Sequence, residues 1–164
     1  MFVAPTGSSS SASCFKATAA RFALARENLE KFKSRVREIT RRTRGVSFAQ
    51  RCVELRRYFQ GWVGYFRLVP IKSFFSDLDK WVRRRIRMCI WVNWKNGRTR
   101  AANLMKLRVP EHVAYTHGMS SKGPWVLSSS QAVHPALSTA LMEERGLPSL
   151  LGIWKKPTAK IRTA

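Results

Sequence analysis

Apolar residues recur at every third or fourth position over three long segments of this sequence, which is the spacing of an amphipathic α-helix. The first segment covers 22–39, the second covers Phe48–Phe66, and the third begins at Ile71 or Ser73 and ends at Trp94. Helices of this length gain most of their stability by packing their apolar stripes against other elements. The spacing therefore predicts an all-α fold whose main part is a three-helix bundle.

The charge balance of the chain is strongly basic. Thirty-one Lys and Arg residues stand against nine Asp and Glu residues, which gives a formal net charge of +22. Self-repulsion at this charge opposes a compact state, whereas the phosphates of a nucleic acid neutralise it and release counterions. The balance favours nucleic acid as the partner. The alternatives are an anionic membrane surface, an acidic protein, or an arginine-rich composition without a polyanionic partner.

Glycine and short polar residues mark the turns between the long segments. Gly45 suits the position just after the first helix, and Ser47 with Gln50 forms a capping box for the second helix. Gly61 and Gly64 interrupt the second helix, where a glycine costs about 1 kcal/mol relative to alanine. Either they permit close approach of a neighbouring backbone or of RNA, or they bend the helix.

After residue 95 the pattern breaks into shorter pieces, which predict an appendix of short helices. The expected pieces are a helix over 101–107, a helix opening at Pro110, a loop over 120–124, an extended segment over 125–127, a helix over 135–145 and an apolar run over 147–154 that docks on the core. The predicted organisation is a disordered Ser/Ala-rich leader (1–21), the bundle (22–95), the appendix (96–154) and a mobile basic tail (155–164).

The third helix separates an apolar face from a basic, aromatic face when it is drawn at about 100° per residue. The apolar face carries Phe74, Phe75, Leu78, Trp81, Val82, Ile86, Cys89 and Val92. The opposite face carries Lys80, Arg83, Arg84, Arg87, Trp91 and Trp94, while Arg85 projects towards the apolar side. Cations that bind phosphates beside rings that stack on bases are typical of a surface for single-stranded RNA. Alternatively, the arginines form a solvated face and the tryptophans pack on another helix.

A second basic group lies at the end of the first segment. It consists of Lys31, Lys33, Arg35, Arg37, Arg41, Arg42 and Arg44. It would line the same groove if the first and third helices were neighbours. Because Glu27, Glu30 and Glu38 partly compensate these charges, an ordinary solvated helix face is the alternative.

The residues that could carry chemistry do not form a catalytic or metal-binding set. Asp77 and Asp79 point in directions about 200° apart on a helix and cannot share a metal, so we expect structural or charge-balancing roles for both. His112, His117 and His134 have no partners at ligand spacing. We therefore expect no catalytic residue, no metal and no cofactor.

Cysteine usage and hydropathy limit the remaining classes. Cys14, Cys52 and Cys89 form no CxxC pair, and the last two fall within apolar helical patterns, which indicates small buried side chains. No stretch approaches the roughly 20 apolar residues of a membrane-spanning helix. The sequence predicts no membrane partner, no small-molecule substrate, and a place in the bacterial cytoplasm or an organellar matrix rather than secretion.

Several ordered segments are similar to the maturase-specific region of group II intron reverse transcriptases. They are Arg35–Gly45, Gly61–Arg67, Leu78–Met88, Trp91–Lys95, Arg100–Leu104, Lys122–Ser128, Ala136–Ser138 and Gly146–Leu151. The resemblance runs in order from about Glu30 to Ile153. Agreement in order over this length is much more specific than any one motif.

The resemblance implies a thumb-like helical domain that binds group II intron RNA and helps it to fold and splice, while the ribozyme performs the chemistry. In complete members of the family the same domain also serves reverse transcription during intron mobility. Their catalytic aspartates lie in a YADD motif of the palm, and this sequence contains no such motif. The RNA-binding residues predicted from both lines of reasoning are Lys33, Arg37, Arg41, Arg42, Arg44, Lys80, Arg83, Arg84, Arg87, Trp91, Trp94, Lys95, Arg98 and Arg100.

Three other functions remain open at this point. The chain could be the thumb of a reverse transcriptase that works with a palm on a separate chain. It could be a generic basic nucleic-acid-binding protein without preference for an intron. Membrane binding would need an exposed amphipathic helix, and the apolar stripes suit mutual packing better.

Overall fold

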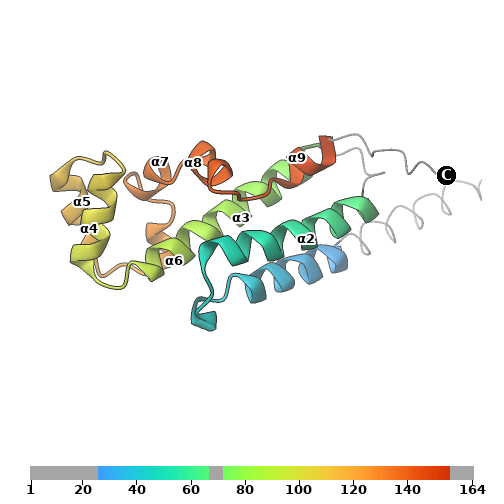
Figure 1. Cartoon of the computed structure of the whole chain (residues 1–164), viewed down its shortest axis with the longest axis horizontal. Helices are drawn as coiled ribbons and strands as arrows, with labels where there is room; N and C mark the ends of the chain where they lie inside the picture. Colours follow the sequence, from blue (N-terminus) through green and yellow to red (C-terminus); the bar gives the residue numbers. More distant parts are fainter. Residues whose placement is uncertain (1–25, 67–71, 156–164) are drawn as a thin grey trace, which may run out of the picture. The chain divides into compact units, whose positions relative to one another are not determined.

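The computed structural model describes residues 26–66 and 72–155, and these ranges contain helices, turns and loops but no strand (Figure 1). The predicted all-α class is therefore confirmed. By its contacts the chain divides into two compact units, 1–38 and 39–164. The division into a bundle and an appendix at residue 95 stays a prediction. The predicted leader and Cys14, and all of the predicted tail except Lys155, lie outside the described residues.

The first unit is represented by a helix that is described from residue 26 and ends at residue 39, just inside the second unit. Phe32 and Val36, four residues apart, are fully buried, as the apolar spacing predicts. On the exposed positions, short ion pairs join residues one turn apart, for example Lys31 with Glu27 at 2.7 Å and Arg35 with Glu38 at 2.6 Å. Part of its basic charge is thus compensated within the helix itself.

The second unit contains one 3-10 turn and eight α-helices among its described residues. They are η1 (Arg42–Arg44), α2 (Phe48–Phe66), α3 (Lys72–Asn93), α4 (Gly97–Lys106), α5 (Glu111–Gly118), α6 (Pro124–Leu127), α7 (Val133–Ala136), α8 (Thr139–Glu144) and α9 (Leu150–Lys155). In Figure 1, α4 and α5 lie side by side at one end of this unit, and α9 runs beside α3 near the other end. The two long helices agree with the predicted segments to within two residues.

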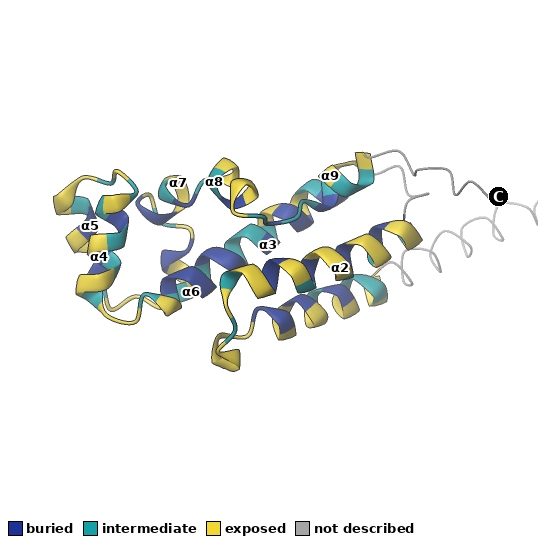
Figure 2. Ribbon diagram, in the orientation of Figure 1, coloured by how far each residue is buried: buried dark blue, intermediate teal, exposed yellow. Residues whose placement is uncertain are grey.

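Helix α3 is the centre of the second unit. Its predicted apolar residues Phe75, Leu78, Val82, Ile86 and Cys89 are all buried. Between residues 81 and 92, moreover, every residue is buried or half-buried, so the opposite face is covered as well (Figure 2). Helices α6 and α9 contact α3 directly. Short helices that the sequence only outlined thus provide a second layer over α3.

Aromatic side chains join α2, α3 and α9. The ring of Trp62 on α2 lies 6.1 Å from Phe74 and 6.0 Å from Phe75, measured between centroids. Phe75 in turn stacks at 5.7 Å on Trp154 of α9. Because aromatic pairs at these distances add to the burial of their large apolar surfaces, this cluster fixes the end of α9 against both long helices.

Arginines hold the turn that ends the first helix. Its carbonyl groups have lost their helical partners and carry the negative end of the helix dipole. Arg44 donates to the Ile39 carbonyl at 3.2 Å, and Arg51 of α2 donates to the Arg41 carbonyl at 3.3 Å. Arg85 of α3 donates to the Thr40 hydroxyl oxygen at 3.1 and 3.2 Å. This explains why Arg85 points to the apolar side of α3.

A buried carboxylate fastens the start of α9 to α3. Asp79 is 3% exposed and accepts hydrogen bonds from the Ser149 hydroxyl at 2.7 Å and from the amides of Leu150 at 2.8 Å and Leu151 at 3.0 Å. It therefore satisfies amides that the first turn of a helix leaves without partners. Asp77, two residues earlier, is exposed and pairs with Lys80 at 2.9 Å. Both aspartates have the structural roles that the sequence predicts.

The appendix departs from the sequence prediction in four places. Helix α4 begins at Gly97, with the Asn96 side chain as its cap, and not at residue 101. Residues 125–127 are helical in α6, not extended, because Pro124 starts a helical turn there. The predicted helix over 135–145 is two helices, α7 and α8, separated at Leu137 and Ser138, and the Ser138 side chain caps α8 through the Leu141 amide at 3.3 Å. Pro110 is the N-cap of α5 and not its first residue.

Two glycines allow α4 and α5 to pack at close range. A Cβ atom on Gly118 would lie 2.8 Å from the Gly97 carbonyl oxygen and 3.0 Å from the Ala101 amide nitrogen. Neither backbone atom can move without displacing its helix. By contrast, a Cβ atom on Gly61 or Gly64 would meet no described atom of the chain within 4 Å. Packing against a neighbouring backbone of the described chain therefore does not explain the two glycines of α2.

Gly118→Ala is expected to lower the free energy of unfolding by about 2 kcal/mol, because the added methyl group overpacks a backbone contact. Gly61→Ala is the matched control, and it should raise that free energy by about 0.5–1 kcal/mol through helix propensity. Urea denaturation of both variants measures the difference. Equal effects of the same sign would contradict the close packing of α4 on α5.

Candidate nucleic-acid interface

The predicted RNA-binding face of α3 is largely used inside the protein. Arg87 is 4% exposed and donates through Nε to the Leu137 carbonyl at 3.0 Å, after the end of α7. Trp91 is fully buried. These positions of Arg87 and Trp91 contradict their predicted roles as exposed RNA contacts. The physical reason is that short helices cover this face, which the helical wheel of α3 alone does not reveal.

Arg84 is held in the same way by α6. Its guanidinium lies over the Trp125 ring at 4.1 Å from the centroid and donates to the Trp125 carbonyl at 3.2 Å. A cation over an aromatic face is attracted by the ring electrons, and the aliphatic stem adds apolar contact. Arg84 therefore fastens α6 to α3, and its charge is only partly available to an external anion.

Two other predicted residues of α3 remain nearer the surface. Lys80 is exposed but pairs with Asp77 at 2.9 Å, and Arg83 is half-buried. Positive potential from this stretch reaches α7, where the pKa of His134 lies below its ordinary value. The causes are the charge of Arg87 first, then partial burial, and then the charge of Arg83. An anion near Arg83 would meet a field that is already strongly positive.

Trp94, Lys95, Arg98 and Arg100 come together where α3 ends and α4 begins, and we call this group the α3–α4 corner. Arg100 lies over the buried Trp91 ring at 5.2 Å and donates to the Lys95 carbonyl at 3.1 Å. The half-buried Trp94 ring is 5.8 Å from that of Trp91. Trp91 thus supports the corner from inside.

The corner is positively charged for two independent reasons. Lys95 and Arg98 are exposed, and no acidic residue occurs from Lys80 to Pro110. In addition, the first turn of α4 contains no acid to balance the positive end of its helix dipole. Cations at this end of a helix do not stabilise it, whereas an anion bound there would be stabilised. Among the predicted residues, Lys95 and Arg98 are therefore the best placed to bind phosphate.

The predicted basic residues around η1 do not all have the same surroundings. Arg41 and Arg42 are exposed. Arg44 forms a two-pronged ion pair with Glu54, at 2.8 Å and 3.1 Å, besides its bond to the Ile39 carbonyl. The sequence did not reveal this pair, because Glu54 lies on another helix. Arg41 and Arg42 are consequently better candidates for phosphate than Arg44.

Two predicted residues, Lys33 and Arg37, belong to the first unit. Glu30 lies 3.2 Å from Lys33 and 3.9 Å from Arg37. Glu30 thus partly neutralises the charges of Lys33 and Arg37, which agrees with the alternative of an ordinary solvated helix face. That these two residues line a groove with α3 stays a prediction. The sequence analysis also passed over several basic residues that the structure exposes, for example Arg57, Lys106, Arg108 and Lys122.

The described residues offer no set for covalent or metal chemistry. Burial raises the pKa of the Cys52 thiol to about 11 and also raises that of Cys89, so both thiols stay protonated. Over 26–66 and 72–155, no group of three or more His, Cys, Asp or Glu side chains is placed to hold a metal ion. In the same ranges, none of the helices has the length and apolar character needed to cross a membrane.

Comparison with known proteins gives a match that covers the two long helices α2 and α3 and the α3–α4 corner. Residues 29–108 match the family model described as the group II intron, maturase-specific domain. The matched range contains α2, α3, α4 and every predicted RNA-binding residue. Comparison with curated protein sequences gives no match.

Proposed function

We propose that this chain, whose residues 29–108 match the family model of the group II intron, maturase-specific domain, belongs to that family, binds group II intron RNA and assists the folding and splicing of the intron. The family match carries this proposal. The net charge of +22 and the exposed cations of the α3–α4 corner support it, since RNA binding draws most of its affinity from phosphate contacts.

In this proposal the chain is a binding scaffold. The exposed cations hold the RNA backbone in one arrangement and lower the free energy of the folded intron relative to misfolded forms. The ribozyme then performs splicing. In this proposal the domain takes no chemical step, and the reverse transcription and mobility of complete family members would need a palm in addition to it.

The corner is the part of the interface with the clearest test. Arg98→Gln removes one exposed cation from the first turn of α4 and should weaken binding of intron RNA about three- to tenfold at low salt. The slope of log affinity against log salt should fall by about 0.7–0.9. Arg145→Gln is the matched control, because Arg145 is also exposed but follows two glutamates at the end of α8, and it should change neither quantity.

The experiment titrates the full chain with a group II intron RNA and with an unrelated RNA of equal length, at several salt concentrations. A preference for the intron that persists as salt rises supports the proposal. Equal affinities that fall together would leave a generic basic nucleic-acid-binding protein. DNA synthesis only after addition of a palm-bearing chain would favour the thumb of a two-chain polymerase.

A further inference from the structure

An arginine occupies a backbone position at the end of α4 that usually belongs to glycine. Arg108 has φ +64°, in the left-handed region. Its amide donates to the Met105 carbonyl at 2.9 Å, and the next amide, of Val109, donates to the Leu104 carbonyl at 3.1 Å. These two bonds define the Schellman motif, in which glycine is favoured at the position of Arg108 because a Cβ atom is disfavoured there.

The same turn elsewhere in this chain does use glycine. At the end of α8, the Gly146 amide donates to the Glu143 carbonyl and the Leu147 amide donates to the Met142 carbonyl, both at 2.9 Å. Gly146 has φ +92°. The turn at the end of α4 therefore carries the Arg108 side chain at a position where the backbone conformation favours glycine. Lys106 already supplies a cation to the last turn of α4, so the helix dipole does not require a second one.

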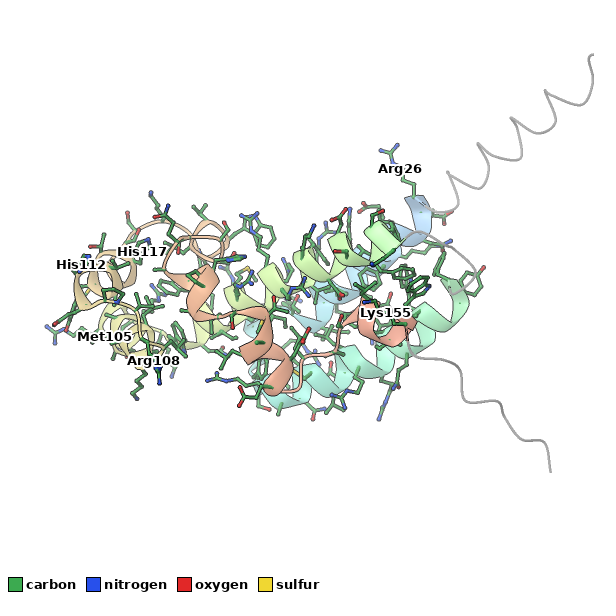
Figure 3. All side chains as sticks on the ribbon, turned by 90° about the horizontal axis from the view of Figure 1, so that it is seen from above. Arg26, Met105, Arg108, His112, His117 and Lys155 are labelled. Carbon is green, nitrogen blue, oxygen red and sulfur yellow. The ribbon has the colours of Figure 1, made fainter. Side chains whose placement is uncertain are left out.

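Arg108 borders a pocket of about 390 Å³ between the α4–α5 turn and α7. This volume lies within the range of about 300–1,000 Å³ that is usual for small-ligand sites. Val109 and Pro110 line one side, Ala132 and Pro135 line the other, and the Gln131 amide is the polar group besides Arg108. Figure 3 shows Arg108 next to Met105 at the α4–α5 end of the second unit, far from Lys155. We call this site the α4–α7 pocket.

We propose that the α4–α7 pocket binds one unpaired nucleotide of the intron RNA. Arg108 contacts the phosphate, the apolar walls cover the face of the base, and the Gln131 amide bonds to the base edge. Recognition of RNA by sequence or by shape depends on such unstacked bases, and an amide both donates and accepts, as a base edge does. The inference rests on the proposed function and adds to it a site for one nucleotide.

The charge of the surroundings agrees with this ligand. From Lys80 to Pro110 the sequence has no acidic residue. The next carboxylate, Glu111, is exposed in the first turn of α5, where it balances the positive end of that helix. Phosphate at Arg108 also extends the line of cations that begins at the α3–α4 corner, about 15 Å away along the ten residues of α4.

The test compares Arg108→Gly, Gln131→Ala and the control Arg145→Gln in the full chain, each titrated with a group II intron RNA across salt. Arg108→Gly relieves the backbone, so its Tm should stay equal or rise by about 2 °C. Its affinity should nevertheless fall about three- to tenfold, and its salt slope by about 0.7–0.9. Gln131→Ala should lower affinity about threefold without changing the salt slope.

Crosslinking provides an independent test of the nucleotide site. Intron RNA that carries 4-thiouridine should crosslink to residues 107–113 or 131–136 of the wild-type chain, and the crosslink should weaken in Arg108→Gly. The inference is overturned if the wild-type chain prefers the intron while both pocket variants bind it with unchanged affinity and slope. If the wild-type chain shows no preference for the intron, the proposed function fails first and the nucleotide site falls with it.

Discussion

Replacing Trp91 with alanine is expected to lower the free energy of unfolding by about 4 kcal/mol, because the indole is fully buried and its removal leaves a large cavity. The variant also removes the ring under the Arg100 guanidinium and beside the Trp94 ring. Urea denaturation followed by circular dichroism measures the loss. The α3–α4 corner should become disordered along with the core around it.

Trp91→Phe separates packing from RNA stacking. It keeps a ring and also removes the indole Nε1, which has no hydrogen-bond partner in the described part of the chain. We expect it to cost less than half the stability lost in Trp91→Ala, with unchanged affinity for intron RNA. A stable Trp91→Ala protein that binds RNA poorly would instead make Trp91 an exposed stacking residue, against the burial described above.

Replacing Asp79 with alanine is expected to lower the free energy of unfolding by about 3 kcal/mol. The change leaves the amides of Leu150 and Leu151 without their acceptor, and a buried donor without a partner retains its full desolvation cost. Helix α9 should separate from α3 first, and the Phe75–Trp154 stack should open. The fluorescence of Trp154, observed in a variant without the other tryptophans near it, reports that step.

Asp77→Ala is the matched control for Asp79→Ala. Asp77 lies two residues earlier on the same helix, and its side chain is 71% exposed beside Lys80. Exposed ion pairs of this kind are worth about 0.5 kcal/mol or less, so stability should hardly change. If the two alanine variants lost equal stability, the contacts of Asp79 with α9 would not be what stabilises it.

The long helices could be predicted from the sequence because each contains enough turns for its apolar spacing to be read. Helices α6 to α9 have only four to six residues, too few for any period to show. Their boundaries depend instead on single caps such as Pro124 and Ser138. This is why the appendix was predicted in outline while two of its segments were assigned wrongly.

The candidate site was harder to predict than the fold, because a helical wheel treats arginine as a marker of solvent. On α3, Arg84 and Arg87 instead bury their stems and bond to backbone carbonyls of the appendix. A carbonyl acceptor has no signature in the sequence. The exposed cations at Arg41 and Arg98, in contrast, follow directly from their places at the ends of helices.

A polyanion does not meet at the surface every positive charge that the formal net charge of +22 includes. Arg51, Arg84, Arg85 and Arg87 already form hydrogen bonds between elements inside the protein, and the acceptors of these bonds are neutral oxygens. These arginines are occupied in holding the helices together, whereas the outermost cations can release counterions when RNA binds. The number of ions displaced by RNA will therefore count the cations that contact phosphate, and the arginines that hold the helices together will not be among them.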